Sequence, residues 1–180
     1  MIGGGANVRF RPEADICMHI RPATTADFDA MWSLFQSVIA KADALPFAEG
    51  FDVEAFRGHW FTTQASYVAV AEAGILGMYK MGANYPDLGA HVASATYAVD
   101  PAVQGRGIGR ALVEHSLAQA RSAGFLAMQF NYVVSTNAPA LALYRKLGFE
   151  IVGTLPKAFQ HREWGLVDAY VMHQFLQIGA

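Results

Sequence analysis

Residues 104–109 read Gln-Gly-Arg-Gly-Ile-Gly, between a strand-like run that ends at Asp100-Pro101 and a helix-like run from Arg110. Glycines let the backbone turn sharply and approach a ligand without a Cβ atom in the way. N–H groups at the start of a helix attract anions, because they lack partners within the helix and lie at the positive end of its dipole. The segment therefore predicts an anion-binding loop, and a pyrophosphate is the anion that suits it best.

Two common nucleotide-binding loops do not fit these residues. A phosphate loop of the nucleotide-hydrolysing type needs Gly-Lys followed by Ser or Thr, but Arg110-Ala111 follows here. A dinucleotide fingerprint needs its third glycine one residue later than Gly109, and an acidic residue about 20 positions onward, where this chain has Gln129 and Asn131. What remains is the pattern Gln-x-x-Gly-x-Gly, or else a tight strand-to-helix connection that binds nothing.

Hydrophobic periodicity and turn residues predict an α+β fold. The expected elements are a strand at 18–22, helices at 24–41 and from the cap Asp52, a hairpin at 67–81, a strand at 91–99, a helix to about 123, a strand at 125–134, a helix capped by Asn137, and strands at 150–155 and 166–175. A polar loop with Lys157, His161 and Arg162 is expected between the last two strands. This order indicates a mixed sheet with helices on both faces.

Composition narrows the class of protein. With 180 residues, 53% of them hydrophobic and 16% charged, the chain is long enough for one domain with a real core. We expect a loose N-terminal extension over 1–17 and a single domain over 18–180. A net charge of -2 argues against a nucleic-acid partner, and no apolar run is long enough to cross a membrane. A single cysteine and no secretion signal favour the cytoplasm.

A second motif, residues 137–149, reads Asn-Ala-Pro-Ala-Leu-Ala-Leu-Tyr-Arg-Lys-Leu-Gly-Phe. Together with residues 99–109, it makes the chain resemble the GNAT superfamily of N-acetyltransferases from about Met18 to Phe175. The resemblance implies a mixed, mainly antiparallel sheet of six or seven strands, about four helices on both faces, and a V-shaped cleft between the central strands. It also implies acetyl-CoA as cosubstrate and no metal.

The resemblance also implies which residues hold acetyl-CoA. The pyrophosphate lies on backbone N–H groups of the glycine loop, the pantetheine arm pairs with the strand before it, and the N–H of Val99 polarises the thioester oxygen. The residues so assigned are Tyr97, Ala98, Val99, Gln104, Gly105, Arg106, Gly107, Ile108, Gly109, Arg110, Asn137 and Tyr144. Asn137 is expected to cap its helix as well.

Tyr144 is the expected general acid. A departing thiolate needs a proton, and the reference pKa values of a thiol (about 8.5) and of tyrosine (about 10) are close enough for a phenol to give it. Packing against the sheet is the alternative role for Tyr144. The strand 91–99 has no glutamate to act as base, so Asn131 is expected to hold the substrate or a water, with His91 and His173 as other candidates.

The resulting expectation is acetyl transfer to the amine of a small molecule, such as an amino acid or an analogue, by direct attack in a ternary complex. Phe47, Phe51, Phe56 and Trp60 are expected to make the acceptor side apolar, and Lys157 or Arg162 to receive a carboxylate. Two alternatives stay open: acetylation of a protein N-terminus or lysine, and a non-catalytic acetyl-CoA sensor. A homodimer through the terminal strand is a further possibility.

Overall fold

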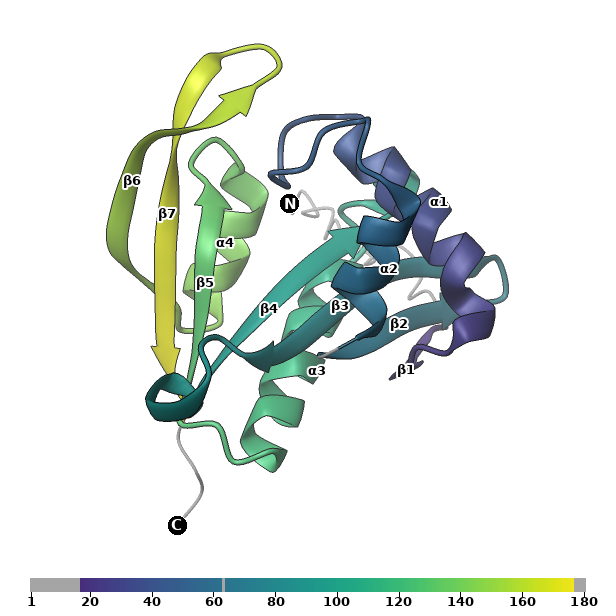
Figure 1. Ribbon diagram of the computed structural model, residues 1–180, viewed down its shortest axis with the longest axis horizontal. Coiled ribbons are helices and arrows are strands. Elements are labelled where there is room, and N and C mark those ends of the chain that lie inside the picture. The colour runs from purple at the N-terminus through teal and green to yellow at the C-terminus, as the bar shows by residue number, and fades with distance from the viewer. Residues whose placement is uncertain (1–16, 63, 177–180) are drawn as a thin grey trace, which may run out of the picture.

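The computed structural model describes residues 17–62 and 64–176, which form a seven-stranded sheet with helices on both faces (Figure 1). The strand order is β1-β2-β3-β4-β5-β7-β6. The strands are β1 (His19–Pro22), β2 (Ala65–Ala71), β3 (Gly74–Ala83), β4 (Val92–Val99), β5 (Ala127–Val134), β6 (Glu150–His161) and β7 (Gly165–Phe175). The α-helices are α1 (Phe28–Ile39), α2 (Val53–Phe61), α3 (Ile108–Ser122) and α4 (Ala138–Lys146). The expected fold class is confirmed.

The helices begin where the sequence provides caps. Asp27 accepts hydrogen bonds from the N–H and the hydroxyl of Thr24, at 2.8 and 3.0 Å, before α1. Asp52 accepts N–H groups of the first turn of α2, and Asn137 Oδ1 accepts the N–H of Ala140 at 3.2 Å in α4. The α3 helix differs, because its N-cap is Gly107 and no side chain caps it.

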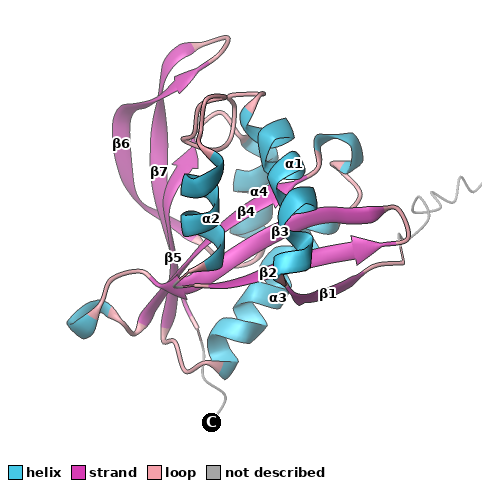
Figure 2. Cartoon of the chain, turned by 45° about the vertical axis from the view of Figure 1, so that its right-hand side comes forward, coloured by secondary structure: helices cyan, strands magenta, loops and turns pink. Residues whose placement is uncertain are grey.

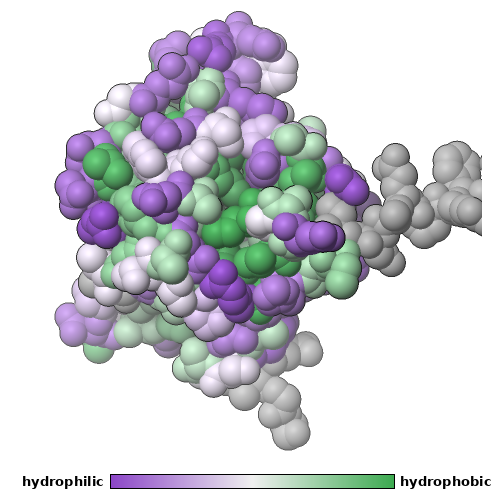
Figure 3. All heavy atoms as spheres, turned by 90° about the vertical axis from the view of Figure 1, so that its right-hand side faces the viewer, coloured by the Kyte–Doolittle hydropathy of each residue, from purple (hydrophilic) through white to green (hydrophobic). Residues whose placement is uncertain are grey.

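Helices cover both faces of the sheet (Figure 2), and each face has its own hydrophobic core. On one face α1 and α2 pack on β2 and β3 through Phe35, Phe56, Trp60 and Met78, all with at most 1% of their surface exposed. On the other face α3 and α4 pack on the sheet through residues that include Ile108, Leu112, Leu141 and Phe149. On the side seen in Figure 3, hydrophobic residues gather near the centre and hydrophilic ones surround them.

The pairing between β4 and β5 sets the position of the site. All other neighbouring strands are antiparallel, whereas β4 and β5 are parallel and pair only from Val92 to Ser94 with Ala127 to Gln129. Beyond Ser94 the two strands diverge (Figure 1). This divergence opens the sheet at its centre, at the carboxyl ends of both strands.

The prediction of a polar loop at 156–165 was wrong. Strand β6 continues to His161 and pairs with β7 up to Gly165, so a three-residue turn remains. The interruption at Pro156 is a bulge: the register shifts between Leu155 and Phe159, and Lys157 has a φ of 51°. Its N–H donates to Asp168 Oδ1 at 2.8 Å, which stabilises the bulge.

Most of the N-terminal extension expected at 1–17 lies outside the described residues. Among the residues that the structure describes, no helix is both long and apolar enough to span a membrane. Strand β7, considered above for pairing between subunits, already has β5 and β6 as neighbours within the chain.

Candidate active site

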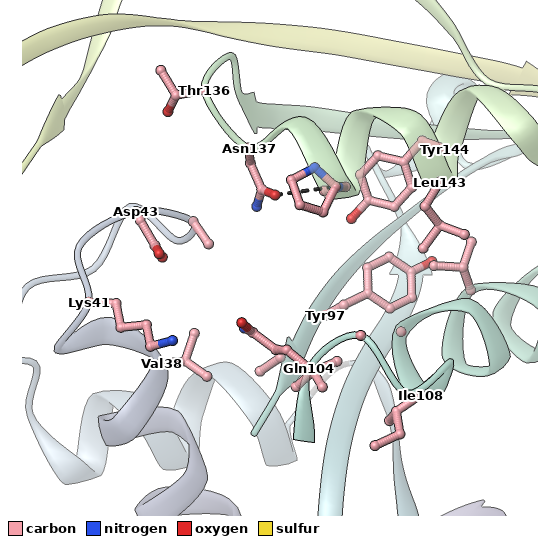
Figure 4. Close-up of a pocket in the computed structure, with 18 of the residues that line it drawn as sticks. Val38, Lys41, Asp43, Tyr97, Gln104, Ile108, Thr136, Asn137, Leu143 and Tyr144 are labelled. Carbon is pink, nitrogen blue, oxygen red and sulfur yellow. Dashed lines mark hydrogen bonds between the residues drawn. The ribbon is translucent and has the colours of Figure 1, made fainter. Parts of the chain in front are cut away.

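A cavity of about 690 Å³ lies where β4 leaves β5 (Figure 4). It is lined by the end of β4, the glycine loop, residues of α3 and α4, the end of α1 with the segment that follows it, and the end of β6 with its turn to β7. Of the residues assigned to acetyl-CoA from the sequence, eleven line it: Tyr97, Ala98, Val99, Gln104, Gly105, Gly107, Ile108, Gly109, Arg110, Asn137 and Tyr144. The structure thus brings the two motifs together around one space.

The glycine loop presents main-chain atoms to this cavity. Gly105 and Gly107 have φ angles of 79° and 84°, which favour glycine strongly, and a Cβ atom on either would meet no atom within 4 Å. The N–H of Ala111 bonds to the carbonyl of Gly107, so the N–H groups of Ile108, Gly109 and Arg110 belong to the uncapped first turn. These three groups and the helix dipole suit a negatively charged ligand.

Strand β4 directs part of its backbone into the same cavity. The N–H of Asp100 bonds to the carbonyl of Leu76, and the N–H of Asn84 bonds to the carbonyl of Val92. In an antiparallel ladder the hydrogen-bonded pairs alternate, so the even-numbered residues of β4 bond to β3. The backbone groups of Tyr97 and Val99 therefore face the other way, where β5 has already diverged.

Tyr144 lies on the wall formed by α4, and its hydroxyl points into the cavity (Figure 4). Its ring packs against Phe130, with centroids 4.6 Å apart, and against Phe149 at 6.0 Å. Burial raises the pKa of the Tyr144 hydroxyl to about 12. The group is therefore protonated at neutral pH and can act as a hydrogen-bond or proton donor.

Tyr97 is fixed by its side chain. Its hydroxyl is 2.7 Å from Ser116 Oγ, and Ser116 Oγ in turn donates to the carbonyl of Val113 at 2.7 Å. Burial raises the pKa of the Tyr97 hydroxyl well above its usual value, so this group stays neutral. The centroid of its ring lies 6.4 Å from that of Tyr144, so the open edge of β4 lies beside the wall that carries Tyr144.

Two of the predicted site residues lie elsewhere. Arg106 is exposed and does not line the cavity. Asn131 is also outside the lining; its Oδ1 accepts Gln129 Nε2 at 2.7 Å and its Nδ2 donates to Asn84 Oδ1 at 2.6 Å. Arg110 lines the cavity, but its guanidinium is bound to Glu114 at 2.8 Å.

Several alternatives raised for the acceptor side also lie away from the cavity. Neither His91 nor His173 lines it, and Lys157 does not. The aromatic residues expected to form an apolar wall pack on one another beneath α1 and α2: Phe35 contacts Phe47, Phe51, Phe56 and Trp60, with ring centroids 5.1–6.3 Å apart. They form a core, because Phe56 and Trp60 are 0% and 1% exposed.

The part of the lining opposite the two motifs, where the acceptor was expected, was largely not predicted from the sequence. It consists of Val38 at the end of α1 with Lys41, Asp43 and Ala44 after it, and of His161 at the end of β6 with Arg162, Glu163 and Trp164 in the turn to β7. These two segments are about 120 positions apart in sequence, and neither has a regular pattern that would predict their contact. The only signal was the cluster of charged residues in each.

Arg162 joins these two segments across the cavity. Its guanidinium donates to the carbonyl of Ala40 at 2.8 Å and to Glu49 Oε1 at 3.1 Å. Its backbone N–H also donates to the carbonyl of Ala42, at 3.4 Å. Beside it, the rings of His161 and Trp164 are stacked with centroids 4.6 Å apart. We call this connection the Arg162 strap.

The described residues contain no group of three or more histidine, cysteine, aspartate or glutamate side chains placed to hold a metal ion.

Comparison with known proteins agrees with this geometry. The model of the Acetyltransferase (GNAT) family matches residues 31–149, which include the glycine loop, β4 and α4. The chain belongs to the GNAT family. The family predicted from the two motifs is therefore confirmed.

Solved structures of other family members have the same fold. A GCN5-related N-acetyltransferase from Kribbella flavida superposes with a TM-score of 0.84 at 38% identity, over 88% of this chain and 98% of that one. The structure of YncA from Salmonella typhimurium, described with its cofactor acetyl-CoA, matches with a TM-score of 0.74 at 23% identity, over 91% and 96% of the two chains.

Two of the curated relatives that match are acetyltransferases by name. The L-methionine sulfoximine/L-methionine sulfone acetyltransferase of Pseudomonas aeruginosa is 31% identical over 149 residues, which are 78% of this chain and 85% of that protein. The N-acetyltransferase aca1 of Schizosaccharomyces pombe is 33% identical over 98 residues, 54% of this chain and 47% of that protein. The chain spans less than half the length of the first curated relatives it matches.

Proposed function

We propose that this protein transfers the acetyl group of acetyl-CoA to the amine of a small molecule, such as an amino acid or an analogue, by direct attack in a ternary complex. The observation that carries the proposal is the convergence on one cavity of the uncapped N-terminus of α3, the open edge of β4 and the Tyr144 hydroxyl.

Acetyl-CoA fits the donor half of the cavity. Its pyrophosphate needs several N–H donors and close approach, which Gly105, Gly107 and the first turn of α3 supply without a charged side chain. Its pantetheine arm carries amides that can bond to the free backbone groups of Tyr97. The N–H of Val99 then donates to the thioester oxygen, on which negative charge develops during attack.

Tyr144 supports the chemical step as an acid. The amine forms a C–N bond with the acetyl carbon, the C–S bond breaks, and the sulfur leaves as a thiolate that takes a proton from Tyr144. Burial raises the pKa of Tyr144 to about 12, and the same surroundings raise the pKa of a thiol, because both anions lose hydration. The difference in proton affinity between the two groups therefore stays small.

The Arg162 strap favours a small acceptor over a protein. A peptide needs an open groove along the acceptor side, whereas here Arg162 ties the turn between β6 and β7 to the segment after α1. The relative from Pseudomonas aeruginosa, which covers most of this chain, is named for free amino-acid analogues. Other relatives are named for protein N-termini, among them N-alpha-acetyltransferase RimI of Mycobacterium tuberculosis, 44% identical over 79 residues, so peptides are the principal competing acceptors.

The test measures release of coenzyme A thiol from acetyl-CoA with a panel of amino acids, amino-acid analogues, small amines and peptides. We expect turnover with at least one small amine, and a fall in kcat of about 10²-fold or more in Tyr144→Phe with unchanged affinity for acetyl-CoA by calorimetry. Tyr132→Phe, outside the cavity lining, serves as the matched control. Turnover with peptides alone would refute the small acceptor, and binding without turnover on any acceptor would indicate a sensor.

A further inference from the structure

Acetyl transfer to an amine needs a group that removes a proton from nitrogen, and strand β4 does not provide one. Its residues, Val-Ala-Ser-Ala-Thr-Tyr-Ala-Val from 92 to 99, include no carboxylate and no histidine. The side chains facing the cavity from α3 and α4 provide no base either, since the titratable ones are Arg110 and the protonated Tyr144. A base must therefore come from the acceptor side.

The described residues of the lining that can accept a proton on this side are two carboxylates, Asp43 and Glu163, and the imidazole of His161. The His161 ring is buried, stacks on Trp164, and its Nδ1 accepts the backbone N–H groups of the turn, so it holds the turn together. Glu163 is exposed, at the tip of the turn between β6 and β7. Asp43 is half-buried, and within the described part of the chain it takes part in none of the ion pairs. Figure 4 draws Asp43 on the wall that follows α1, across the cavity from Tyr144.

The backbone on both sides of Asp43 is held in place. The N–H groups of Lys41 and Ala42 bond to the carbonyls of Val38 and Ile39, at 3.2 and 3.0 Å, and Ala42 has a φ of 48°, which turns the chain at the end of α1. The carbonyls of Ala40 and Ala42 accept hydrogen bonds from Arg162. The Arg162 strap thus positions the segment that carries Asp43.

We propose that Asp43 is the general base of the reaction. This rests on the proposed acetyl transfer. An amine bound between Asp43 and Tyr144 has a proton acceptor on the side of its nitrogen and a proton donor on the side of the leaving sulfur, which is the arrangement that direct attack needs. Loops beside a rigid sheet often carry such residues.

The proton and electron balance closes with these two side chains. The nitrogen lone pair forms the C–N bond to the acetyl carbon, and the electrons of the C–S bond go to sulfur. The nitrogen, made cationic by the attack, gives a proton to the Asp43 carboxylate, while sulfur takes the proton of Tyr144. Transfer of one proton from Asp43 to the Tyr144 phenolate through solvent restores both groups and leaves an acetamide and free coenzyme A.

Chemical rescue tests this role. In Asp43→Ala, assayed with a small-amine acceptor found in the panel above, we expect kcat to fall about 10²-fold while calorimetry gives the wild-type affinity for acetyl-CoA. Formate added to the variant enters the space left by the carboxylate, and we expect it to raise kcat at least about 5-fold in a saturable manner. We expect formate to have no such effect on the wild type.

Two matched variants sharpen the result. Asp29→Ala removes an exposed carboxylate on α1, outside the lining, and is expected to keep kcat within about 2-fold of the wild type. Glu163→Ala removes the other carboxylate of the lining and is expected to lower kcat less than Asp43→Ala does. A kcat within 3-fold of wild type in Asp43→Ala, a larger loss in Glu163→Ala, or no response to formate would each overturn the assignment. If the wild type acetylated no amine at all, the proposed acetyl transfer itself would be overturned, and the role of Asp43 with it.

Discussion

The two edges of β4 have different fates. Toward β3 the strand is paired over seven residues, from Ala93 with Ala83 to Val99 with Gly77. Toward β5 the pairing stops after Ser94. Along this strand the even-numbered residues therefore bond to β3, whereas Tyr97 and Val99 present an open backbone on the other side. Much of this site therefore consists of backbone N–H and C=O groups that have no partner strand.

The difference has a physical basis in how strands pair. Backbone N–H and C=O groups that are buried without partners are costly, so a sheet normally saturates them. Here the groups of Tyr97 and Val99 line a cavity instead of dry core, so water or a ligand can satisfy them. A ligand with its own amides, lying along this edge, replaces the missing neighbour strand.

Proline substitutions separate the two edges most strongly, because each removes one N–H group. Proline also fixes φ at about −65°, a cost that both variants share. Val99→Pro deletes an N–H that faces the cavity, and we expect it to fold normally and to lose roughly 10²–10³-fold in kcat. Ala98→Pro deletes an N–H bonded to β3, and we expect a lower melting temperature, from a loss of about 1–3 kcal/mol.

The readouts are steady-state kinetics and thermal unfolding of both variants. A Val99→Pro protein that is folded and fully active would show that the N–H of Val99 does not contact the thioester.

Glycine substitutions compare the donor loop with an ordinary helix end. Gly107 and Gly124 have φ angles of 84° and 82°, and a Cβ atom on either would meet nothing within 4 Å. Replacement by alanine therefore strains both backbones similarly, by about 1–2 kcal/mol. Only Gly107→Ala places a methyl group in the cavity, and we expect its Kd for acetyl-CoA to rise at least about 10-fold by calorimetry.

The variant Gly124→Ala is the control, since Gly124 follows α3 at its far end. Equal donor affinity in the two variants would argue that the loop 104–109 does not hold the pyrophosphate.

The Arg162 strap belongs to the acceptor side alone. Arg162→Ala removes the hydrogen bond to the Ala40 carbonyl and the ion pair with Glu49, both at exposed positions. We expect a rise of about 3–10-fold in KM for the amine and no change in the Kd of acetyl-CoA, because the donor side stays intact. The exposed Arg57, paired with Glu54 on α2, gives the control variant Arg57→Ala. A change in the Kd of acetyl-CoA instead would show that the Arg162 strap acts on the donor side and contradict its assignment to the acceptor side.

The stability of the face covered by α1 and α2 is expected to depend on pH through His59. Burial and the charge of Lys80 lower the pKa of His59 to about 4, from 6.5. Unfolding thus takes up a proton below pH 6.5, so stability contributed by neutral His59 is complete above pH 6.5 and is lost as the pH falls toward 4. We expect melting temperatures to fall over this window by a few degrees, and less steeply in His59→Gln, with unchanged donor affinity at neutral pH.

His115, whose pKa is also lowered by burial, leaves a residual slope in the variant. Parallel curves of melting temperature against pH for the two proteins would show that His59 does not contribute to the pH dependence of stability.

Local patterns predicted the two motifs that the structure brings together at the cavity. The glycines before α3 and the Asn-to-Phe motif of α4 carry their meaning in consecutive residues, because caps, turns and helix faces depend on neighbours in sequence. Both motifs line the cavity as expected. The role of Tyr144 as the acid stays a prediction.

The acceptor half was not predictable in the same way. Asp43 and Arg162 meet the cavity only because β6 extends past a bulge at Lys157 and brings its turn to the end of α1. Pro156 and the positive φ of Lys157 interrupt the alternation by which strands are recognised, so this stretch suggested a loop. Likewise, Phe56 and Trp60 suggested a cavity wall, but the packing of α2 on β2 and β3 buries them.

The Gly105 and Gly107 backbone has a consequence for how this protein can change over time. If the acyl carrier is recognised by peptide groups, then its recognition depends on chain path and survives most replacements of surrounding side chains. The opposite wall, built from the side chains of two separate connections, is free to vary. One scaffold can thus keep the same acyl carrier while its acceptor changes.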